Sequence, residues 1–506
     1  MSDRSVRVRF APSPTGPLHI GGVRTALYNY LFAKKNNGTF ILRIEDTDQK
    51  RFVEGAESYI NQSLEWLGIR VDEGVVQGGS LGPYKQSERM DKYAAYAKQL
   101  INNGYAYYAF DTQEELTEMR SKLEVSNMSA KYDSTSRMSM KNSLTLSDDE
   151  VNERLERGDN YIIRIKLPRN EEIRFKDVIR GWIVFNSSQL DDKVLLKEDG
   201  LPTYHLANIV DDHLMEISHV IRGEEWLPSA PLHVMLYRYL GWENTMPKFA
   251  HLPLILKPDG KGKLSKRDGD RLGFPVFPIE WTSPEGEVSS GYRESGYLSE
   301  AVVNMLSMLG WHPSDNQELF TLEELVEAFE LERVSKSGAK FDMDKSKWFN
   351  HQFIMRASSD ELKGMIEDQL TSIHTHRGDD YLNRVIDLLR EKVTFPMELL
   401  SMGQYFFDLP SSYDEKVLRK KWNEEVSNHM NQFIDGLVDS KYSKAAQIEE
   451  HLNNYAEQNE ISKGKLMQPL RWVVSGQAGG PPIFDMLELI GIDEIKRRMD
   501  VVNEKF

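Results

Sequence analysis

The sequence predicts an α/β domain with a parallel sheet, interrupted by an insertion and followed by an all-α region. Two observations carry this prediction. Strand-like and helix-like segments alternate over residues 1–110, and the same pattern resumes over residues 196–270. From about residue 297 onward the apolar spacing is almost entirely helical, as in Leu298, Ala301, Val302 and Met305. Alternating strands and helices favour a parallel sheet, and the gap in the pattern favours a domain inserted at a crossover.

Length and composition agree with a multidomain enzyme. A chain of 506 residues is expected to hold about three domains, and a hydrophobic share of 40% is enough for real cores. No apolar run is long enough to span a bilayer, and the first residues lack the apolar stretch of a signal peptide. We therefore expect a cytoplasmic protein with no membrane partner. The chain has no cysteine, which excludes disulfides, cysteine nucleophiles and thiolate zinc sites, so no zinc is expected.

The first chemical signal lies at a strand-to-helix junction. Residues 6–10 alternate like a short strand, a Pro/Ser/Thr/Gly turn follows, and Val23 then begins a helical pattern. His19, Gly21 and Gly22 fall at the junction, where free N–H groups and the helix dipole attract anions. Glycine lets a phosphate approach the backbone closely, and histidine can donate a hydrogen bond to it. The alternative is a capped helix with an ordinary surface histidine.

The alternating pattern continues after this junction. Residues 39–44 are predicted to form a second strand that leads into Glu45-Asp46-Thr47-Asp48, and residues 59–67 and 93–101 to form amphipathic helices. The insertion, residues 111–195, contains a helix at 113–123, a polar Ser/Met-rich stretch at 125–143, and strands at 161–167 and 182–185. Residues 271–290 are rich in Pro, Gly and aromatics and are interpreted as a loop or small excursion.

The second chemical signal is Lys263-Leu264-Ser265-Lys266-Arg267. It follows an apolar strand at residues 251–256 and a Gly/Lys-rich turn. A mobile loop with Lys263 and Lys266 could close on a triphosphate and balance the charge that builds as pyrophosphate leaves. Lys266 is assigned the transition-state role. Taken alone, such a basic loop is more often solvated surface.

Together the two segments resemble the HIGH and KMSKS signatures of class I aminoacyl-tRNA synthetases. Two further stretches narrow the resemblance to glutamyl-tRNA synthetase of the bacterial or organellar type: Leu201-Pro202-Thr203-Tyr204-His205-Leu206-Ala207-Asn208 and His219-Val220-Ile221-Arg222-Gly223-Glu224-Glu225-Trp226. The resemblance implies a Rossmann-like catalytic domain that joins L-glutamate to tRNA(Glu) with ATP as a substrate. Mg²⁺ is expected with ATP, and no protein cage for a metal is visible.

The resemblance also implies the site residues. The amino-acid contacts are Arg9, Ser13, Glu45, Tyr204, Asn208 and Arg222; the ATP contacts are His19, Gly21, Gly22, Glu225, Trp226, Lys263 and Lys266, of which His19, Lys263 and Lys266 are catalytic. An arginine can grip a carboxylate with two parallel hydrogen bonds, and Glu45 suits an ammonium group. The alternative for Glu45 and Arg222 is salt bridging inside the fold. Asp211-Asp212 is interpreted as strand-end structure rather than a metal site.

The C-terminal half resembles the stem-contact and anticodon-binding helices of bacterial-type glutamyl enzymes. Phe341-Asp342-Met343-Asp344-Lys345 and Gln468-Pro469-Leu470-Arg471 carry that resemblance, and Arg384 and Lys392 fall where the family reads anticodon bases. A solvated helix face is the alternative for these two. The net charge of −16 does not exclude a tRNA partner, because RNA binding needs only local basic surface. A monomer is expected, and whether tRNA(Gln) is also charged stays open.

The sequence therefore divides into five predicted parts. These are the first half of the catalytic domain (1–110), the acceptor-binding insertion (111–195), the second catalytic half with the KLSKR loop (196–270), the excursion and stem-contact region (271–340) and the helical anticodon-binding region (341–506). Two other functions fit the same motifs: adenylyl transfer to another small acid, and tRNA binding without catalysis. A pyrophosphate-exchange assay distinguishes the three functions, because only a glutamate–tRNA ligase requires both glutamate and tRNA for exchange.

Overall fold

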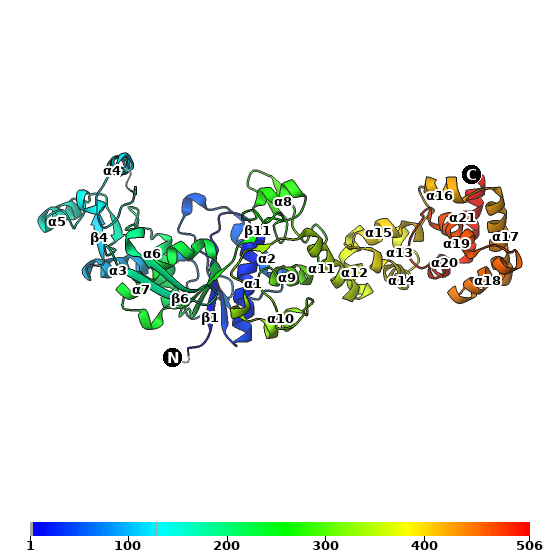
Figure 1. Ribbon diagram of the computed structural model, residues 1–506, viewed down its shortest axis with the longest axis horizontal. Coiled ribbons are helices and arrows are strands. Elements are labelled where there is room, and N and C mark those ends of the chain that lie inside the picture. Colours follow the sequence, from blue (N-terminus) through cyan, green and yellow to red (C-terminus); the bar gives the residue numbers. More distant parts are fainter. Residues whose placement is uncertain (1–3, 127–128) are drawn as a thin grey trace. The chain divides into compact units, whose positions relative to one another are not determined.

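The computed structural model describes residues 4–126 and 129–506 (Figure 1). It divides into two compact units. The first consists of residues up to 294 together with Val302–Met343, and the second of Ser295–Ala301 together with Asp344–Phe506. Within the described ranges, no helix is long and apolar enough to cross a membrane.

The first unit is built on a largely parallel sheet, as predicted. Strands β1 (Arg7–Phe10), β2 (Thr39–Leu42) and β3 (Glu73–Gly74) pair in that order, all parallel. A second set has the order β7 (Gly181–Asn186), β6 (Glu172–Asp177), β10 (Lys248–Leu252), β9 (His219–Gly223), in which β10 pairs in parallel with β9. The backbone N–H of Ser218 donates to the carbonyl of Arg7 at 2.8 Å, which places β9 beside β1.

Helices surround this sheet and make up most of the second unit. Up to residue 298 they are α1 (Ile20–Lys35), α2 (Ala56–Trp66), α3 (Met90–Asn102), α4 (Gln113–Val125), α5 (Asp148–Arg157), α6 (Tyr204–Leu214), α7 (Ala230–Tyr239) and α8 (Lys266–Leu272). After it they are α9 (Ser299–Ser307), α10 (Leu322–Ala328), α11 (Met343–Arg356), α12 (Ser359–Ile366), α13 (Ser372–Thr375), α14 (Asp379–Leu389), α15 (Glu398–Gly403), α16 (Glu415–Lys421), α17 (Glu424–Ser440), α18 (Ala445–Gln458), α19 (Lys463–Ser475), α20 (Ile483–Ile490) and α21 (Ile492–Lys505).

The first strand and helix form for the reasons visible in the sequence. Val8 and Phe10 are buried in β1, and α1 turns Val23, Leu27 and Leu31 into the core. This helical spacing of apolar residues is what predicted the helix. The turn between the two elements is thereby held against the ends of the sheet.

The predicted insertion contributes strands to two different sheets. Strands β4 (Ala106–Ala109), β5 (Ile162–Ile165) and β8 (Val194–Leu196) form a small antiparallel sheet of their own. The hairpin of β6 (Glu172–Asp177) and β7 (Gly181–Asn186) instead joins the catalytic sheet, with Asp177 opposite Phe249 of β10. Alternating burial along β6, with Ile173 and Phe175 inside, fits this place against the core.

Asp211 and Asp212 lie in α6 and are fully buried. Asp212 accepts hydrogen bonds from Arg9 of β1 and from Arg43, which directly follows β2, in agreement with the predicted role of stabilising strand ends. One local prediction needs correction. The KLSKR segment is not a loop throughout, because the Ser265 side chain caps α8, which begins at Lys266. In such a capping box Ser265 and Asp268 bond each other's backbone N–H, which explains why a helix starts inside the basic segment.

The excursion after α8 is a small folded feature rather than an open loop. It contains a short hairpin, β12 (Trp281–Thr282) and β13 (Val288–Ser289). The carbonyl of Val276 accepts the backbone N–H of Ile20 at 3.0 Å, which ties the excursion to the start of α1. Strand β14 (Ala339–Lys340) pairs with β11 (Ile255–Leu256), so the first unit needs residues beyond 338.

Candidate active site

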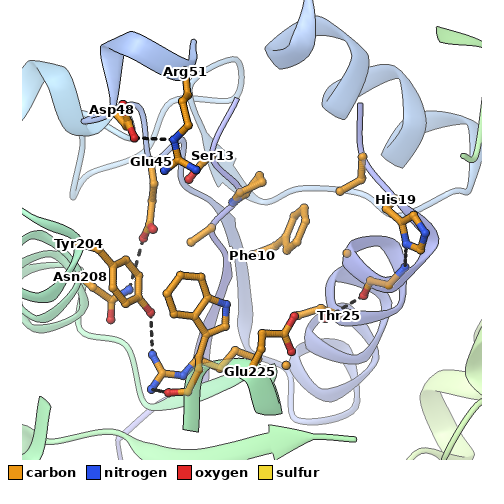
Figure 2. Close-up of a pocket in the computed structure, with 18 of the residues that line it drawn as sticks. Phe10, Ser13, His19, Thr25, Glu45, Asp48, Arg51, Tyr204, Asn208 and Glu225 are labelled. Atoms are coloured by element: carbon orange, nitrogen blue, oxygen red, sulfur yellow. Dashed lines mark hydrogen bonds and ion pairs between the residues drawn. The ribbon is translucent and has the colours of Figure 1, made fainter. Parts of the chain in front are cut away.

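A cleft of about 1090 Å³ opens in the first unit (Figure 2). It lies where β1 and β9 end and α1 begins, the usual ligand position at the carboxyl ends of parallel strands. The predicted residues that line it are Arg9, Ser13, His19, Gly21, Gly22, Glu45, Tyr204, Asn208, Arg222, Glu225, Trp226 and Lys263. Segments from both predicted halves of the catalytic domain therefore meet at one site.

Arg9 forms an ion pair at the end of the cleft that Glu45, Tyr204 and Arg222 line. Its Nε and Nη2 donate to the two carboxylate oxygens of Asp212, at 3.0 and 3.3 Å. Arg43 donates to the same carboxylate at 2.8 Å. Burial alone would raise the pKa of Asp212, but the two guanidiniums hold it below its ordinary value. Nη1 of Arg9 makes no hydrogen bond to any residue that the structure describes.

Arg222 is buried without a carboxylate in contact. Its Nε donates to Nε2 of His251 at 3.1 Å, and its Nη1 donates to the Tyr204 hydroxyl at 2.7 Å. Nη1 also lies 3.5 Å from Nδ1 of His233, and Nη2 lies 3.4 Å from the Trp226 carbonyl. The tyrosine hydroxyl and the backbone carbonyl are uncharged, and the two histidine rings are uncharged when they are not protonated. Arg222 as a residue is only 5% exposed, and no carboxylate of the described residues forms an ion pair with it.

The histidines around Arg222 are held neutral. Burial lowers the pKa of His233 well below its usual value, and the positive charge of Arg222 lowers it further. Burial also lowers the pKa of His205 to about 4. His205 Nδ1 and His233 Nε2 are 3.3 Å apart, close enough for one hydrogen bond between neutral rings. Neither ring adds charge next to Arg222 at neutral pH.

Glu45 lies on the same side of the cleft in a network of its own. Its Oε1 accepts from Nη2 of Arg43 at 2.9 Å and from the Asn208 amide at 3.3 Å. Burial raises the pKa of Glu45, and the Arg43 guanidinium opposes that shift. Figure 2 shows Glu45 and Asn208 pointing toward each other beside Tyr204. Glu45 is salt bridged inside the fold and also lines the cleft, and its contact with an amino acid stays a prediction.

Three guanidiniums lie at this end of the cleft, and only one of them has no carboxylate in direct contact. Arg9 pairs with Asp212, and Arg43 pairs with Glu45 and Asp212. Arg222 contacts neutral groups. A buried charge without a direct partner costs free energy until one arrives. This part of the cleft is therefore suited to an anionic group that can approach Arg222.

His19 has a structural role at the other end of the cleft. It is the N-cap of α1, and its Nδ1 accepts the backbone N–H of Gly21 at 3.1 Å. As an acceptor at Nδ1, the neutral ring carries its proton on Nε2. A Cβ atom on Gly22 would lie 2.7 Å from Cδ1 of Leu18, so a larger residue there would make the buried Leu18 side chain shift. The cap and the tight packing fix the helix end that faces the cleft.

Lys263 and Glu225 form an ion pair across the mouth of the cleft, with Nζ and Oε1 at 2.9 Å. Both are more than two-fifths exposed, so the pair is weak and easily rearranged. The Lys266 backbone begins α8, but its side chain lies outside the described residues. The structure thus gives Lys263 a partner and leaves the role of Lys266 a prediction.

Sequence reasoning missed several residues of the cleft. Arg24 lines it from α1 and donates to the carbonyls of Leu309, at 2.8 Å, and Pro253. Arg43 and His251 stand behind the predicted amino-acid contacts. A charged residue next to the end of a buried strand was the available signal for Arg43, which directly follows β2. Nothing in the sequence pairs His251 with Arg222.

The described residues contain no group of three or more His, Asp or Glu side chains placed to hold a metal ion. Asp211, of the acidic pair Asp211-Asp212, has protein partners in place of a metal ion. Its carboxylate accepts from Arg89 at 2.6 Å, from Gln86 at 2.8 Å and from the Tyr93 hydroxyl at 2.8 Å. Its role is to anchor α6 to α3 and the segment before it.

The two predicted anticodon residues lie in the second unit. Arg384 is in α14 and pairs with Glu488 at 3.0 Å, although its side chain is 54% exposed. Lys392 is exposed in the 3-10 turn Arg390–Lys392 that follows α14. Both are accessible to a large ligand, and their contact with RNA stays a prediction.

Comparisons with known proteins agree with this geometry. Residues 5–348 match the family described as tRNA synthetases class I (E and Q), catalytic domain, and residues 361–502 match an anticodon binding domain. The chain is 53% identical to a glutamate–tRNA ligase of Cytophaga hutchinsonii over 99% of this chain and 98% of that one. It is 54% identical to that of Porphyromonas gingivalis over 99% and 100%. A crystal structure of a glutamate tRNA ligase from Elizabethkingia meningosepticum, in complex with its amino acid, superposes with a TM-score of 0.95 at 48% identity, covering 99% of both chains.

Proposed function

This chain belongs to the class I tRNA synthetases for glutamate and glutamine and is a glutamate–tRNA ligase, and we propose that the cleft around Arg222 is where it selects and activates L-glutamate. The family and the activity rest on relatives matched over nearly the whole chain. The assignment of individual residues rests on the geometry of the cleft.

The unpaired charge of Arg222 is the observation that supports this assignment most strongly. Glutamate carries two carboxylates and one ammonium, so one of its carboxylates can pair with the Arg222 guanidinium, which has no carboxylate in direct contact. Nη2 of Arg222 and Nη1 of Arg9 are the guanidinium groups with hydrogens to offer. Glu45, Ser13 and Asn208 supply acceptors and donors for the ammonium and the rest of the amino acid.

The same charge explains selectivity against glutamine. An amide in place of the side-chain carboxylate would leave Arg222 buried and unpaired. A site built for a polar group rejects an analogue that leaves its groups unpaired by ~10⁴-fold or more. Aspartate is one methylene shorter, which is worth only ~1–3 kcal/mol in a simple pocket; misplacement of its carboxylate from the guanidinium adds to that.

Activation needs no nucleophile from the protein. An oxygen of the glutamate α-carboxylate forms a bond to the α-phosphorus of ATP, and the bond to the bridging oxygen breaks as pyrophosphate leaves. The N-terminus of α1, with His19, Gly21 and Gly22, stabilises the phosphate charge. Lys263 and Lys266 neutralise the leaving pyrophosphate, and Glu225 and Trp226 line the ATP end. Mg²⁺ bound to ATP would supply charge neutralisation at its phosphates, and the proposal assigns no protein side chain to hold it.

Transfer to tRNA follows in the same cleft. Class I membership implies that the 2′-hydroxyl of the terminal adenosine attacks the glutamyl carbonyl and releases AMP. The proposed substrate is tRNA(Glu), bound by a cytoplasmic monomer whose helical unit reads the anticodon through Arg384 and Lys392. The insertion between β4 and β8 is proposed to hold the acceptor end.

ATP–pyrophosphate exchange tests this function. Exchange that requires both glutamate and tRNA(Glu) supports it. Exchange with another small acid, or without tRNA, would favour a different adenylyl-transferring enzyme. No exchange under any condition, with tRNA still bound, would favour a tRNA-binding protein without catalysis.

A further inference from the structure

We propose that Asp177 and His251 are positioning residues for substrate selection: together they hold the Arg222 guanidinium by its Nε and so aim its remaining hydrogens into the cleft. The inference rests on the proposed function, because it assigns Arg222 to a carboxylate of glutamate. Neither residue lines the cleft itself.

The three side chains form one buried chain of hydrogen bonds. Nε of Arg222 donates to Nε2 of His251 at 3.1 Å, and Nδ1 of His251 lies 2.7 Å from Oδ2 of Asp177. The proton positions follow from the chemistry. Arginine can only donate, so Nε2 of His251 must accept, and the neutral ring must then carry its proton on Nδ1, toward the carboxylate. His251 and Asp177 are fully buried, and Arg222 is nearly so.

Asp177 is itself fixed to the backbone. Its Oδ1 accepts the N–H groups of Ile179 and Arg180, each at 2.9 Å, and its Oδ2 accepts the N–H of His251 at 3.2 Å. Together with the His251 ring, these bonds hold the pKa of Asp177 below its ordinary value despite burial. The carboxylate therefore stays ionised, and it anchors the imidazole to the point where the β6–β7 hairpin joins the catalytic sheet.

An imidazole serves this position better than a carboxylate would. A carboxylate in direct contact would neutralise Arg222 and compete with the substrate, as Asp212 does at Arg9. His251 accepts the hydrogen bond without adding a negative charge, and because burial lowers its pKa the ring adds no positive charge either. The nearest negative charge on this path is one ring away. Arg222 is thus oriented while its charge remains available.

Substitutions at His251 and Asp177 distinguish a role in orienting Arg222 from a role in packing alone. His251→Leu removes the acceptor, whereas His251→Gln keeps an oxygen that can reach Nε of Arg222. Asp177→Asn changes Arg222 indirectly, through the His251 ring. The amide oxygen of the asparagine would keep the two backbone N–H groups that Oδ1 of Asp177 now accepts, so its NH₂ group would face Nδ1 of His251. The ring proton would then move to Nε2 and oppose the Arg222 N–H. His219→Gln is the matched control, because His219 lies on β9, the strand that carries Arg222, but bonds Ser218 instead of Arg222.

The experiment is steady-state aminoacylation of tRNA(Glu) by the full chain, with glutamate, ATP and tRNA each varied. His251→Leu and Asp177→Asn are expected to raise the KM for glutamate by about 10- to 100-fold, because a misplaced binding group costs rates of this order. The KM for ATP should stay within about twofold, His251→Gln should recover most of the loss, and His219→Gln should match the wild type. Thermal denaturation of each variant shows whether it is folded.

Two results would overturn the inference. One is an unchanged KM for glutamate in folded His251→Leu or Asp177→Asn protein. The other is an equal rise in the KM for glutamate and for ATP, which indicates general disruption. Arg222→Met is measured in parallel: if it impairs glutamate use while the His251 and Asp177 variants do not, the positioning inference fails and the proposed function stands. If Arg222→Met has no effect either, the assignment of Arg222 fails first.

Discussion

Arg9 and Asp212 form a two-point ion pair in the wall of the cleft, with Nε and Nη2 at 3.0 and 3.3 Å from the two carboxylate oxygens. Arg222 lines the same cleft and contacts neutral groups only. The two arginines, which look equivalent in the sequence, therefore differ in what they do. Arg9 is held in an ion pair within the fold, and we propose that the charge of Arg222 is kept for the ligand.

This difference predicts that replacing Arg9 lowers the stability of the protein, whereas replacing Arg222 does not. Arg9→Met leaves Asp212 buried with only Arg43, and breaking a buried ion pair costs about 3–5 kcal/mol. Arg222→Met removes an unpaired buried charge and should not lower the free energy of unfolding. Urea denaturation at neutral pH measures both. Equal destabilisation by the two substitutions would contradict the assignment.

The cap made by His19 can be separated from its chemistry. His19→Ala removes the acceptor for the Gly21 N–H and should cost about 1 kcal/mol of stability. His19→Asn supplies another good N-cap acceptor and should be nearly neutral in stability. Both lose the imidazole, so both should slow pyrophosphate exchange by on the order of 10²-fold. An active His19→Asn enzyme would reduce His19 to a helix cap.

Lys266 is predicted to act in the transition state of activation. Lys266→Ala should slow exchange by raising the activation free energy by about 2.7–4 kcal/mol, with a smaller change in ATP affinity. Lys261→Ala is the control, because Lys261 is an exposed lysine in the same segment. Rapid-quench kinetics of adenylate formation provide the rate. If the two variants behave alike, Lys266 has no such role.

A half-buried histidine with a lowered pKa, His219, predicts a loss of stability in mild acid. Burial, with Lys248 and Arg4 nearby, lowers the pKa of His219 from 6.5 to about 4. Between these values the unfolded chain binds a proton that the folded protein does not. The stability from this residue is therefore complete above about pH 6.5 and is lost as the pH falls toward about 4.

The pH prediction is tested by difference. Denaturation midpoints of wild type and His219→Gln are compared from about pH 8 to about pH 4. The wild type should lose more stability than the variant below about pH 6.5, because glutamine does not titrate. Parallel curves would show that His219 is not held neutral. Carboxylates such as Glu45, whose pKa burial raises, act in both proteins and cancel in the comparison.

Much of the fold could be predicted because it follows from local pattern. The alternation in β1 and the helical spacing after Gly22 identified the strand, the turn and the helix that carry His19. The helical C-terminal half was equally visible. The KLSKR helix was missed because its cap, Ser265 with Asp268, acts within one turn of a segment that otherwise reads as a basic loop.

Pairing between distant charges could not be predicted in this way. Arg9 and Asp212 are 203 residues apart, and the sequence offers many carboxylates of equal standing. The β6–β7 hairpin lay inside the predicted insertion, and only its pairing with β10 brings Asp177 behind His251. Such contacts depend on the tertiary fold, so a single sequence contains no local signal for them.

The discrimination between glutamate and glutamine tests the central claim most directly. The measurement is tRNA-dependent pyrophosphate exchange by wild type and Arg222→Met, with each amino acid in turn. The wild type should prefer glutamate by ~10⁴-fold or more. Arg222→Met should lose at least about 10²-fold with glutamate and little or nothing with glutamine, so that the preference collapses. If the variant keeps the wild-type preference, the positive charge of the Arg222 guanidinium is not what selects glutamate.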